Sequence, residues 1–267
     1  MPPAIPLPAA TVILLRDADR DGTPEVLLLR RHGKSGVLPD MYVFPGGRVE
    51  ERDRPAPGCF GSLSAERVRE LTGSVASELA PAYLVAAIRE TFEEAGILLA
   101  RPRGESRLLS AAHARELAGR RLAVQSGQLD FLELIEREGL ELAADRFSAH
   151  AHWITPEVVP QRFDTLFFTA VAPSDQAALH DGVESTEHVW IRPEDALAQA
   201  ASGERRMIFP TLCNLDTLAG FASAEQAFAA SRARPVIPVL PRLVERDGRR
   251  RLAIPPEAGY RQLEEDL

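Results

Sequence analysis

Apolar and polar positions alternate in a way that divides the chain into strand-like and helix-like segments. Apolar, partly β-branched runs at 10–15 and 26–30, separated by the turn-rich residues 17–24, predict a β-hairpin with an exposed loop. Extended character returns in three later runs, at 147–155, 163–171 and 186–192. Strands mixed with helices in this order predict an α/β layered domain with a mixed sheet.

Apolar residues at helical spacing predict the helices. A helix over 82–92 has Pro81 near its start and Gly96 at its end, which are the favoured residues for those positions. Ser64 is suited to be the N-cap of a second helix over 64–79. Later helical spacing predicts two or three helices within 108–144, a helix opening at Arg192-Pro193 and a helical segment over 207–233, followed by an extended, proline-punctuated run at 235–241.

The helix over 82–92 continues into three glutamates, Glu90, Glu93 and Glu94. Offsets of three and four residues place these carboxylates on one helix face, where like charges raise one another's pKa unless a cation lies among them. Clusters of oxygen ligands suit Mg²⁺ or Mn²⁺. Glutamates that simply face water give the same spacing, so the flanking residues must decide between the two interpretations.

Upstream, residues 42–50 indicate a short apolar strand that runs into the turn Pro45-Gly46-Gly47. Glycine adopts positive φ and lets the backbone approach a ligand closely. A glycine turn that faces an acidic helix is suited to binding a metal-chelated phosphate.

These two segments together resemble the Nudix box of the Nudix hydrolases. The first half is Gly46-Gly47-x-x-Glu50, and the second is Arg89-Glu90-x-x-Glu93-Glu94-x-Gly96 followed by an aliphatic residue. The chain departs from the motif because an insertion splits it, because Asp53 stands where the uninterrupted motif has Glu, and because Thr91 replaces an aliphatic residue. The resemblance implies an α/β/α sandwich with a mixed sheet and the acidic helix beside it.

The resemblance also implies roles for individual residues. The ligands expected for two or more Mg²⁺ or Mn²⁺ ions are Glu90, Glu93, Glu94 and the carbonyl of Gly47. Glu93 or a late-loop glutamate is expected to be the general base, and Glu187, three residues before Trp190, is preferred there over Glu184; a solvated acidic loop is the alternative. Arg89 is expected to orient the carboxylates with Glu50 as its partner, and Gly46 and Arg48 are expected to bind substrate.

A second cluster follows at Trp153-Ile154-Thr155-Pro156 and Arg162-Phe163-Asp164-Thr165. The aromatic residues also fit a plain core. Arg162 begins a strand after a proline-bounded loop, where a guanidinium can grip phosphate oxygens in a bidentate manner. With Pro210-Thr211-Leu212, these segments resemble the Nudix 19 type within that family, whose substrates are coenzyme A and acyl-CoA.

This similarity implies a phosphoanhydride hydrolase that converts a CoA-like nucleotide to phosphopantetheine and adenosine 3',5'-bisphosphate. An ADP-ribose or dinucleotide pyrophosphatase is an alternative. A non-catalytic Nudix fold that senses a ligand or serves in assembly is a rival from another class.

We expect a single decorated domain. The predicted Nudix domain covers 8–204, with an insertion at 51–81 inside the box and a helical insertion at 101–146, and a C-terminal extension at 205–267 packs on the same domain. The first insertion could cover the site, form the interface of a homodimer or pack against the core.

Composition narrows the partners and the location. A net charge of −8 argues against a nucleic-acid-binding surface. No apolar run approaches the roughly 20 residues that span a bilayer, so no membrane segment is expected. Two cysteines, Cys59 and Cys213, predict free thiols rather than a disulfide framework. Prolines replace a signal-peptide pattern at the N-terminus, and the C-terminus lacks a peroxisomal Ser-Lys-Leu, so we expect a cytoplasmic protein.

Overall fold

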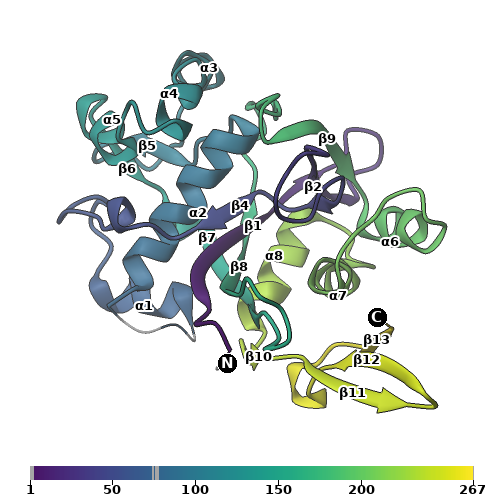
Figure 1. The fold of residues 1–267 in the computed structure, drawn as a ribbon. Helices are drawn as coiled ribbons and strands as arrows, with labels where there is room; N and C mark the ends of the chain where they lie inside the picture. Colours follow the sequence, from purple (N-terminus) through teal and green to yellow (C-terminus); the bar gives the residue numbers. More distant parts are fainter. Residues whose placement is uncertain (1–2, 74, 76–77, 267) are drawn as a thin grey trace.

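An eight-stranded mixed sheet forms the centre of the computed structural model, which describes residues 3–73, 75 and 78–266 (Figure 1). The strand order is β10-β7-β8-β1-β2-β3, while β4 pairs with β1 and β9 pairs with β2. β1 runs parallel to β8, whereas β7 and β8 are antiparallel. The strands are β1 (Leu7–Asp17), β2 (Pro24–Arg31), β3 (Tyr42–Val43), β4 (Gly46–Arg48), β7 (Phe147–Ile154), β8 (Phe163–Val171), β9 (Ser185–Ile191) and β10 (Pro238–Val239).

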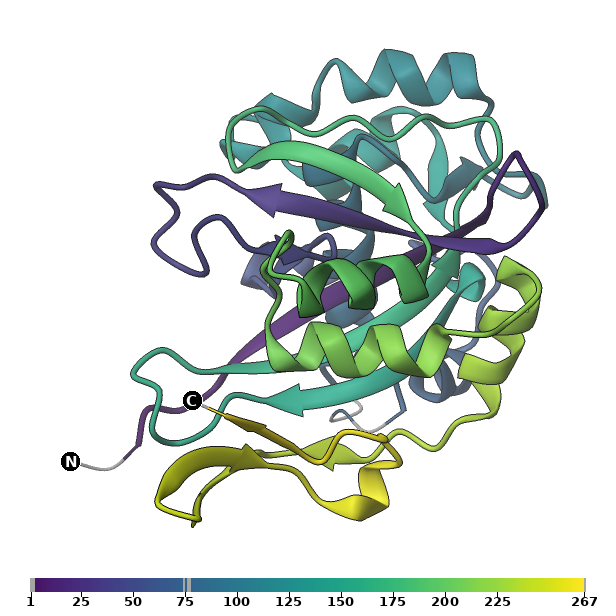
Figure 2. The same cartoon turned by 90° about the vertical axis from the view of Figure 1, so that its right-hand side faces the viewer.

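Helices cover both faces of this sheet. On one face, Val12 and Leu14 of β1 share a core with α1 (Ala65–Thr72) and α2 (Ala80–Ala95). On the other, Ile13 and Leu15 share a second core with α6 (Pro193–Ala201), α7 (Phe209–Leu218) and α8 (Ala224–Ala233). Figure 2 looks onto the second face, where α6 and α7 lie over the strands. The predicted α/β/α sandwich with a mixed sheet is therefore confirmed.

The C-terminal part differs from its prediction. The helical run expected over 207–233 is two helices, which separate near Gly220 at φ 85°. The last residues form a small sheet of β11 (Arg242–Arg246), β12 (Arg249–Ala253) and β13 (Glu264–Asp266), with the 3₁₀ helix η3 (Pro256–Ala258) before β13. Cross-strand ion pairs such as Arg246 with Glu264 link these strands, which explains why a charged segment without strong apolar alternation still forms a sheet.

The two insertions cover the outer side of α2. In the first, η1 (Glu51–Asp53) precedes α1, whose N-cap Ser64 accepts a hydrogen bond from the Arg67 N–H. This helix ends at Gly73 with φ 64°, so it is shorter than the predicted 64–79, and residues 74, 76 and 77 lie outside the described part.

The helical insertion contains three helices and an unpredicted two-stranded sheet. The helices are α3 (Ala111–Ala118), α4 (Arg121–Gln125) and α5 (Phe131–Arg137). Antiparallel pairing of β5 (Ala100–Pro102) with β6 (Leu140–Leu142) closes the insertion at its base, ahead of the 3₁₀ helix η2 (Ala144–Arg146). Leu140, which lies within the run 108–144 predicted to be helical, is therefore a buried residue of a strand. No helix within the described residues is both long and apolar enough to cross a membrane.

Candidate active site

The two glycines that the sequence placed in a turn after Pro45 belong to the short strand β4, and they bring it against both β1 and α2 (Figure 1). A Cβ added at Gly46 would lie 2.5 Å from the Ala10 carbonyl oxygen, and one added at Gly47 would lie 2.4 Å from Glu90 Oε1. Any side chain at either position would therefore displace a strand or a carboxylate. The glycines are required here by close approach to β1 and to Glu90, and neither has the positive φ that the sequence pattern allowed.

The three glutamates of α2 are all buried although their side chains are ionisable. Glu94 Oε2 accepts a hydrogen bond of 3.0 Å from the Gly46 N–H, so this carboxylate is fixed to the turn. Glu90 lies against Gly47. The helix and the turn thus converge, and the structure brings together Gly46, Gly47, Glu90, Glu93 and Glu94 as the sequence predicted.

Arg89 organises this cluster, but its partner is not the predicted Glu50. Its Nε and Nη2 donate to the two carboxylate oxygens of Asp53 at 2.7 and 3.0 Å. Nη1 donates to Glu90 and Glu93 at 2.8 and 3.3 Å, and Nη2 also donates to the Arg48 carbonyl at 3.0 Å. These bonds use all five guanidinium N–H groups, which leaves none to bind substrate.

Glu50 instead accepts a bond of 2.7 Å from Arg52 Nε near the surface. The expected Arg89–Glu50 pair is therefore wrong. Asp53 reaches Arg89 because η1 turns it inward, where it is 1% exposed. One indication of this role was present in the sequence, because Asp53 occupies a position at which the uninterrupted Nudix motif has a glutamate.

Burial sets the electrostatics of the cluster. Burial raises the pKa of Glu90 to about 7, although Arg89 opposes the shift. The pKa of Glu94 lies well above its usual value because of burial and the nearby charge of Glu90. Burial also raises the pKa of Glu93. When they are ionised, Asp53 and the three glutamates carry more negative charge than Arg89 and Arg52 neutralise, and a divalent cation would relieve this excess.

Among the described residues, no three His, Cys, Asp or Glu side chains lie in an arrangement that could hold a metal ion together. The contacts explain the spread of the carboxylates, since Arg89 binds Glu90 and Glu93 while Glu94 turns to Gly46. The donor set still fits a hard divalent cation, because it consists of buried carboxylate oxygens beside a glycine backbone.

Glu187 lies on the other face of the sheet. It is opposite Arg30 in the β2–β9 pairing and accepts hydrogen bonds from Tyr42 Oη at 2.8 Å and Arg205 Nη1 at 3.3 Å. Tyr42 belongs to the core under α6 and α7, away from α2. Burial raises the pKa of Glu187, but its bonds to Tyr42 and Arg205 outweigh burial and the pKa lies below its usual value.

Glu184 belongs to the loop that contacts the end of α2, where the Leu179 N–H donates to the Ala95 carbonyl at 2.9 Å. Glu184 is exposed, and its charge contributes to the raised pKa of Glu94.

The alternation of side chains along β9 indicates that Glu187 points away from α2. Glu187 lies on the same face of the strand as Ile191, which belongs to the core on the opposite side of the sheet from α2. Glu187 was preferred for its spacing from Trp190, which ignores this alternation.

Two further predicted residues have other contacts. Arg162 is buried, and it donates to the carbonyls of Thr155 at 2.9 Å and Ala4 at 2.8 Å, so it joins the N-terminal segment to the sheet. It has no hydrogen bond or ion pair to the α2 glutamates among the described residues. The Arg48 side chain is exposed next to the glycine turn, while its carbonyl accepts from Arg89.

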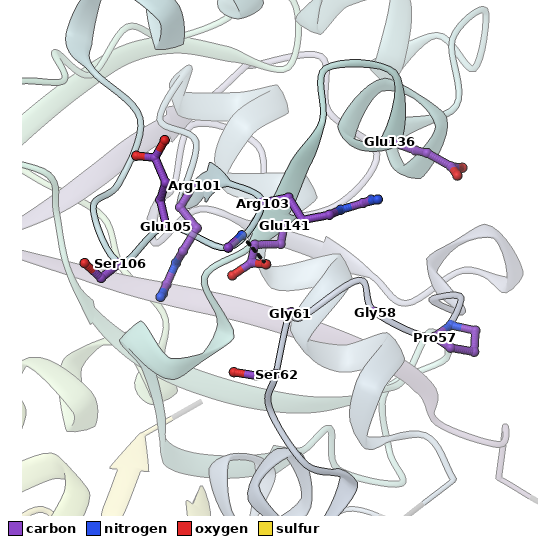
Figure 3. A pocket seen from close by; sticks show the side chains of 11 residues that line it. Pro57, Gly58, Gly61, Ser62, Arg101, Arg103, Glu105, Ser106, Glu136 and Glu141 are labelled. Carbon is purple, nitrogen blue, oxygen red and sulfur yellow. Dashed lines mark hydrogen bonds between the residues drawn. The ribbon is translucent and has the colours of Figure 1, made fainter.

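A cavity of about 690 Å³ lies elsewhere, between the two insertions (Figure 3). None of the α2 glutamates lines it. Glu141 projects into its centre, where it accepts a hydrogen bond of 3.2 Å from the Gly104 N–H. A Cβ at Gly61 would lie 2.5 Å from the same carboxylate, so the first insertion packs closely against β6, and the Leu142 N–H of β6 donates to the Cys59 carbonyl at 2.8 Å.

A mixed sheet between helical layers, with a glycine turn against a helix of buried glutamates, defines a Nudix hydrolase. The model of the NUDT19 Nudix domain matches residues 55–218. The chain belongs to this family, and it is a Nudix enzyme.

Three relatives illustrate the extent of the similarity. The acyl-coenzyme A diphosphatase NUDT19 of Gallus gallus is 30% identical, over 84% of this chain and 71% of that protein. The protein of the same name from Homo sapiens is 29% identical, over 74% of this chain and 61% of its own length. The crystal structure of a NUDIX hydrolase from Alicyclobacillus acidocaldarius has a TM-score of 0.64 at 26% identity, over 85% of this chain and 96% of that one.

Proposed function

We propose that the protein is a metal-dependent CoA or acyl-CoA diphosphatase. Water would cleave the phosphoanhydride to give phosphopantetheine, or its acylated form, and adenosine 3',5'-bisphosphate. The observation that carries the reaction class is the buried Glu90–Glu93–Glu94 cluster against the glycine turn. The acyl-CoA diphosphatase names of relatives that align with most of this chain support the substrate.

Bound Mg²⁺ or Mn²⁺ would neutralise the diphosphate and lower the pKa of the attacking water. Glu90, Glu93 and Glu94 supply the carboxylate oxygens for these ions, together with the Gly47 carbonyl. Arg89 keeps Glu90 and Glu93 in place through its bonds to both and does not contact substrate. Glu184 accepts the proton of the attacking water.

The reaction is tested with CoA, acyl-CoA, ADP-ribose and a dinucleoside polyphosphate, each with Mg²⁺ or Mn²⁺, and the products are identified by mass spectrometry. We expect the highest kcat/KM with CoA or acyl-CoA and no turnover in EDTA. A higher kcat/KM with ADP-ribose or the dinucleotide would favour the pyrophosphatase alternative. Metal-dependent ligand binding without product would favour a sensing module.

Replacing Glu184 is expected to lower kcat on CoA more than replacing Glu187. We expect Glu184→Gln to lower kcat by about 10²- to 10⁴-fold, the usual contribution of a positioned general base. Glu187→Gln removes the same charge three residues later, in β9, from a side chain on the face of the sheet away from α2, and it is the matched comparison. Steady-state kinetics on CoA measure both variants. The reverse order of effects would return the role to Glu187.

A further inference from the structure

The segment between β8 and β9 lies against the end of α2 and against α4 (Figure 1). Its Leu179 N–H donates to the carbonyl of Ala95, the last residue of α2, at 2.9 Å. From α4, the buried Arg121 donates Nη1 to the Leu179 carbonyl and Nη2 to the His180 carbonyl, the latter at 2.6 Å. The start of the segment is thereby held from two sides.

One turn further along α4, Gln125 holds the next part of the same segment. Its Nε2 donates to Asp181 Oδ2 at 2.8 Å. The other oxygen of Asp181, Oδ1, accepts from the N–H groups of Val183, Glu184 and Ser185 at 2.9, 3.1 and 2.9 Å. Gln125 therefore fixes the carboxylate around which the backbone of Glu184 is wound.

The same helix reaches the other side of the glutamate cluster. The Val124 carbonyl accepts a bond of 3.2 Å from Arg52 Nη1, and Arg52 Nη2 lies 3.9 Å from Glu93 Oε1. Although α4 belongs to the helical insertion, it thus contacts residues on both sides of the α2 carboxylates.

We propose that α4 is a positioning element of the active site, in which Arg121 and Gln125 hold the 179–185 loop, and with it Glu184, against the C-terminal end of α2. This inference rests on the proposed function. The loop has an exposed tip with Gly182 at φ 76°, and it needs external hydrogen bonds to keep one conformation. A displacement of a catalytic group by about 1 Å can cost about 100-fold in rate, so such bonds have a kinetic effect.

The kinetic test uses Arg121→Leu, with Arg120→Leu as its control. Arg120 precedes α4 and carries the same charge, but it pairs with Glu138 inside the insertion at 2.7 Å. We expect Arg121→Leu to lower kcat on CoA by about 10- to 100-fold with KM changed by less than about 3-fold. Arg120→Leu should keep wild-type kcat.

A double-mutant cycle separates positioning from general loss of structure. If Arg121 acts through Glu184, Arg121→Leu should cost less than about 3-fold in a Glu184→Gln background, because the positioned group is already absent. An equal cost in both backgrounds, or an equal loss in Arg120→Leu, overturns the positioning role.

Hydrogen–deuterium exchange tests the clamp without substrate. Residues 183–185 should exchange about tenfold faster in Arg121→Leu and in Gln125→Ala than in wild type, and Arg120→Leu should leave them unchanged. Unchanged exchange in the first two variants overturns the clamp. If wild type hydrolyses none of the four substrates, the proposed function and the positioning role both fail, while exchange still reports whether the clamp exists.

Discussion

Asp53→Ala is expected to destabilise the protein by about 3–5 kcal/mol. The Arg89–Asp53 pair is bidentate and 1% exposed on both sides, so removing Asp53 breaks a buried ion pair and leaves two buried guanidinium N–H groups without their acceptor. Arg89 is 1% exposed, so the surrounding side chains keep solvent from these N–H groups. Urea unfolding of the metal-free protein, followed by circular dichroism, measures the change.

The exposed pair Arg67–Glu70 on α1 provides the control. Its side chains are 39% and 55% exposed, and Glu70→Gln is expected to cost less than about 1 kcal/mol. A loss in Asp53→Ala no larger than that of Glu70→Gln would contradict the view that the buried pair holds the first insertion to α2.

Local patterns predicted the elements that build the site. The strands β1, β2 and β8 follow from apolar runs, and α2 follows from its apolar spacing between Pro81 and Gly96. Gly96 adopts φ 69°, the left-handed conformation that ends a helix. Because these signals act within one or two turns of chain, sequence alone was enough for them.

Contacts between distant segments were harder to predict. Arg89 and Asp53 are separated by 36 residues, and nothing local indicates that η1 turns Asp53 inward instead of Glu50. The same applies to Arg121, whose bonds to residues 58 and 59 positions away depend on how the insertion packs. Helical spacing predicted helices in the insertion, but it carries no information on which carbonyls those helices bind.

Glu94→Gln is expected to lower kcat on CoA by at least about 10²- to 10³-fold while leaving the fold intact. The substitution removes a carboxylate charge from the proposed metal site, but the amide oxygen can still accept the Gly46 N–H. Glu93→Gln is expected to abolish turnover in the same way. Steady-state kinetics with Mg²⁺ or Mn²⁺ measure the loss, and Glu116→Gln on the exposed face of α3 is the control.

Without metal, Glu94→Gln should make the protein more stable to unfolding, although the same substitution lowers turnover. The folded-state pKa of Glu90 is raised from 4.5 to about 7, so the folded state binds more protons than the unfolded state in that window, and stability falls as pH rises through it. Glu94 contributes to this loss of stability because its charge and that of Glu90 repel. Without this neighbour Glu90 ionises more easily, so Glu94→Gln should unfold at a higher temperature than wild type at pH 8, with a shallower dependence on pH.

The combination of lost turnover and raised metal-free stability distinguishes a metal site from a structural one. A carboxylate that only stabilises the fold would, on removal, lower both quantities together. Undiminished hydrolysis in Glu93→Gln and Glu94→Gln would contradict the metal-site assignment. A lower unfolding temperature in Glu94→Gln at pH 8 would instead contradict the excess of negative charge from which that assignment is argued.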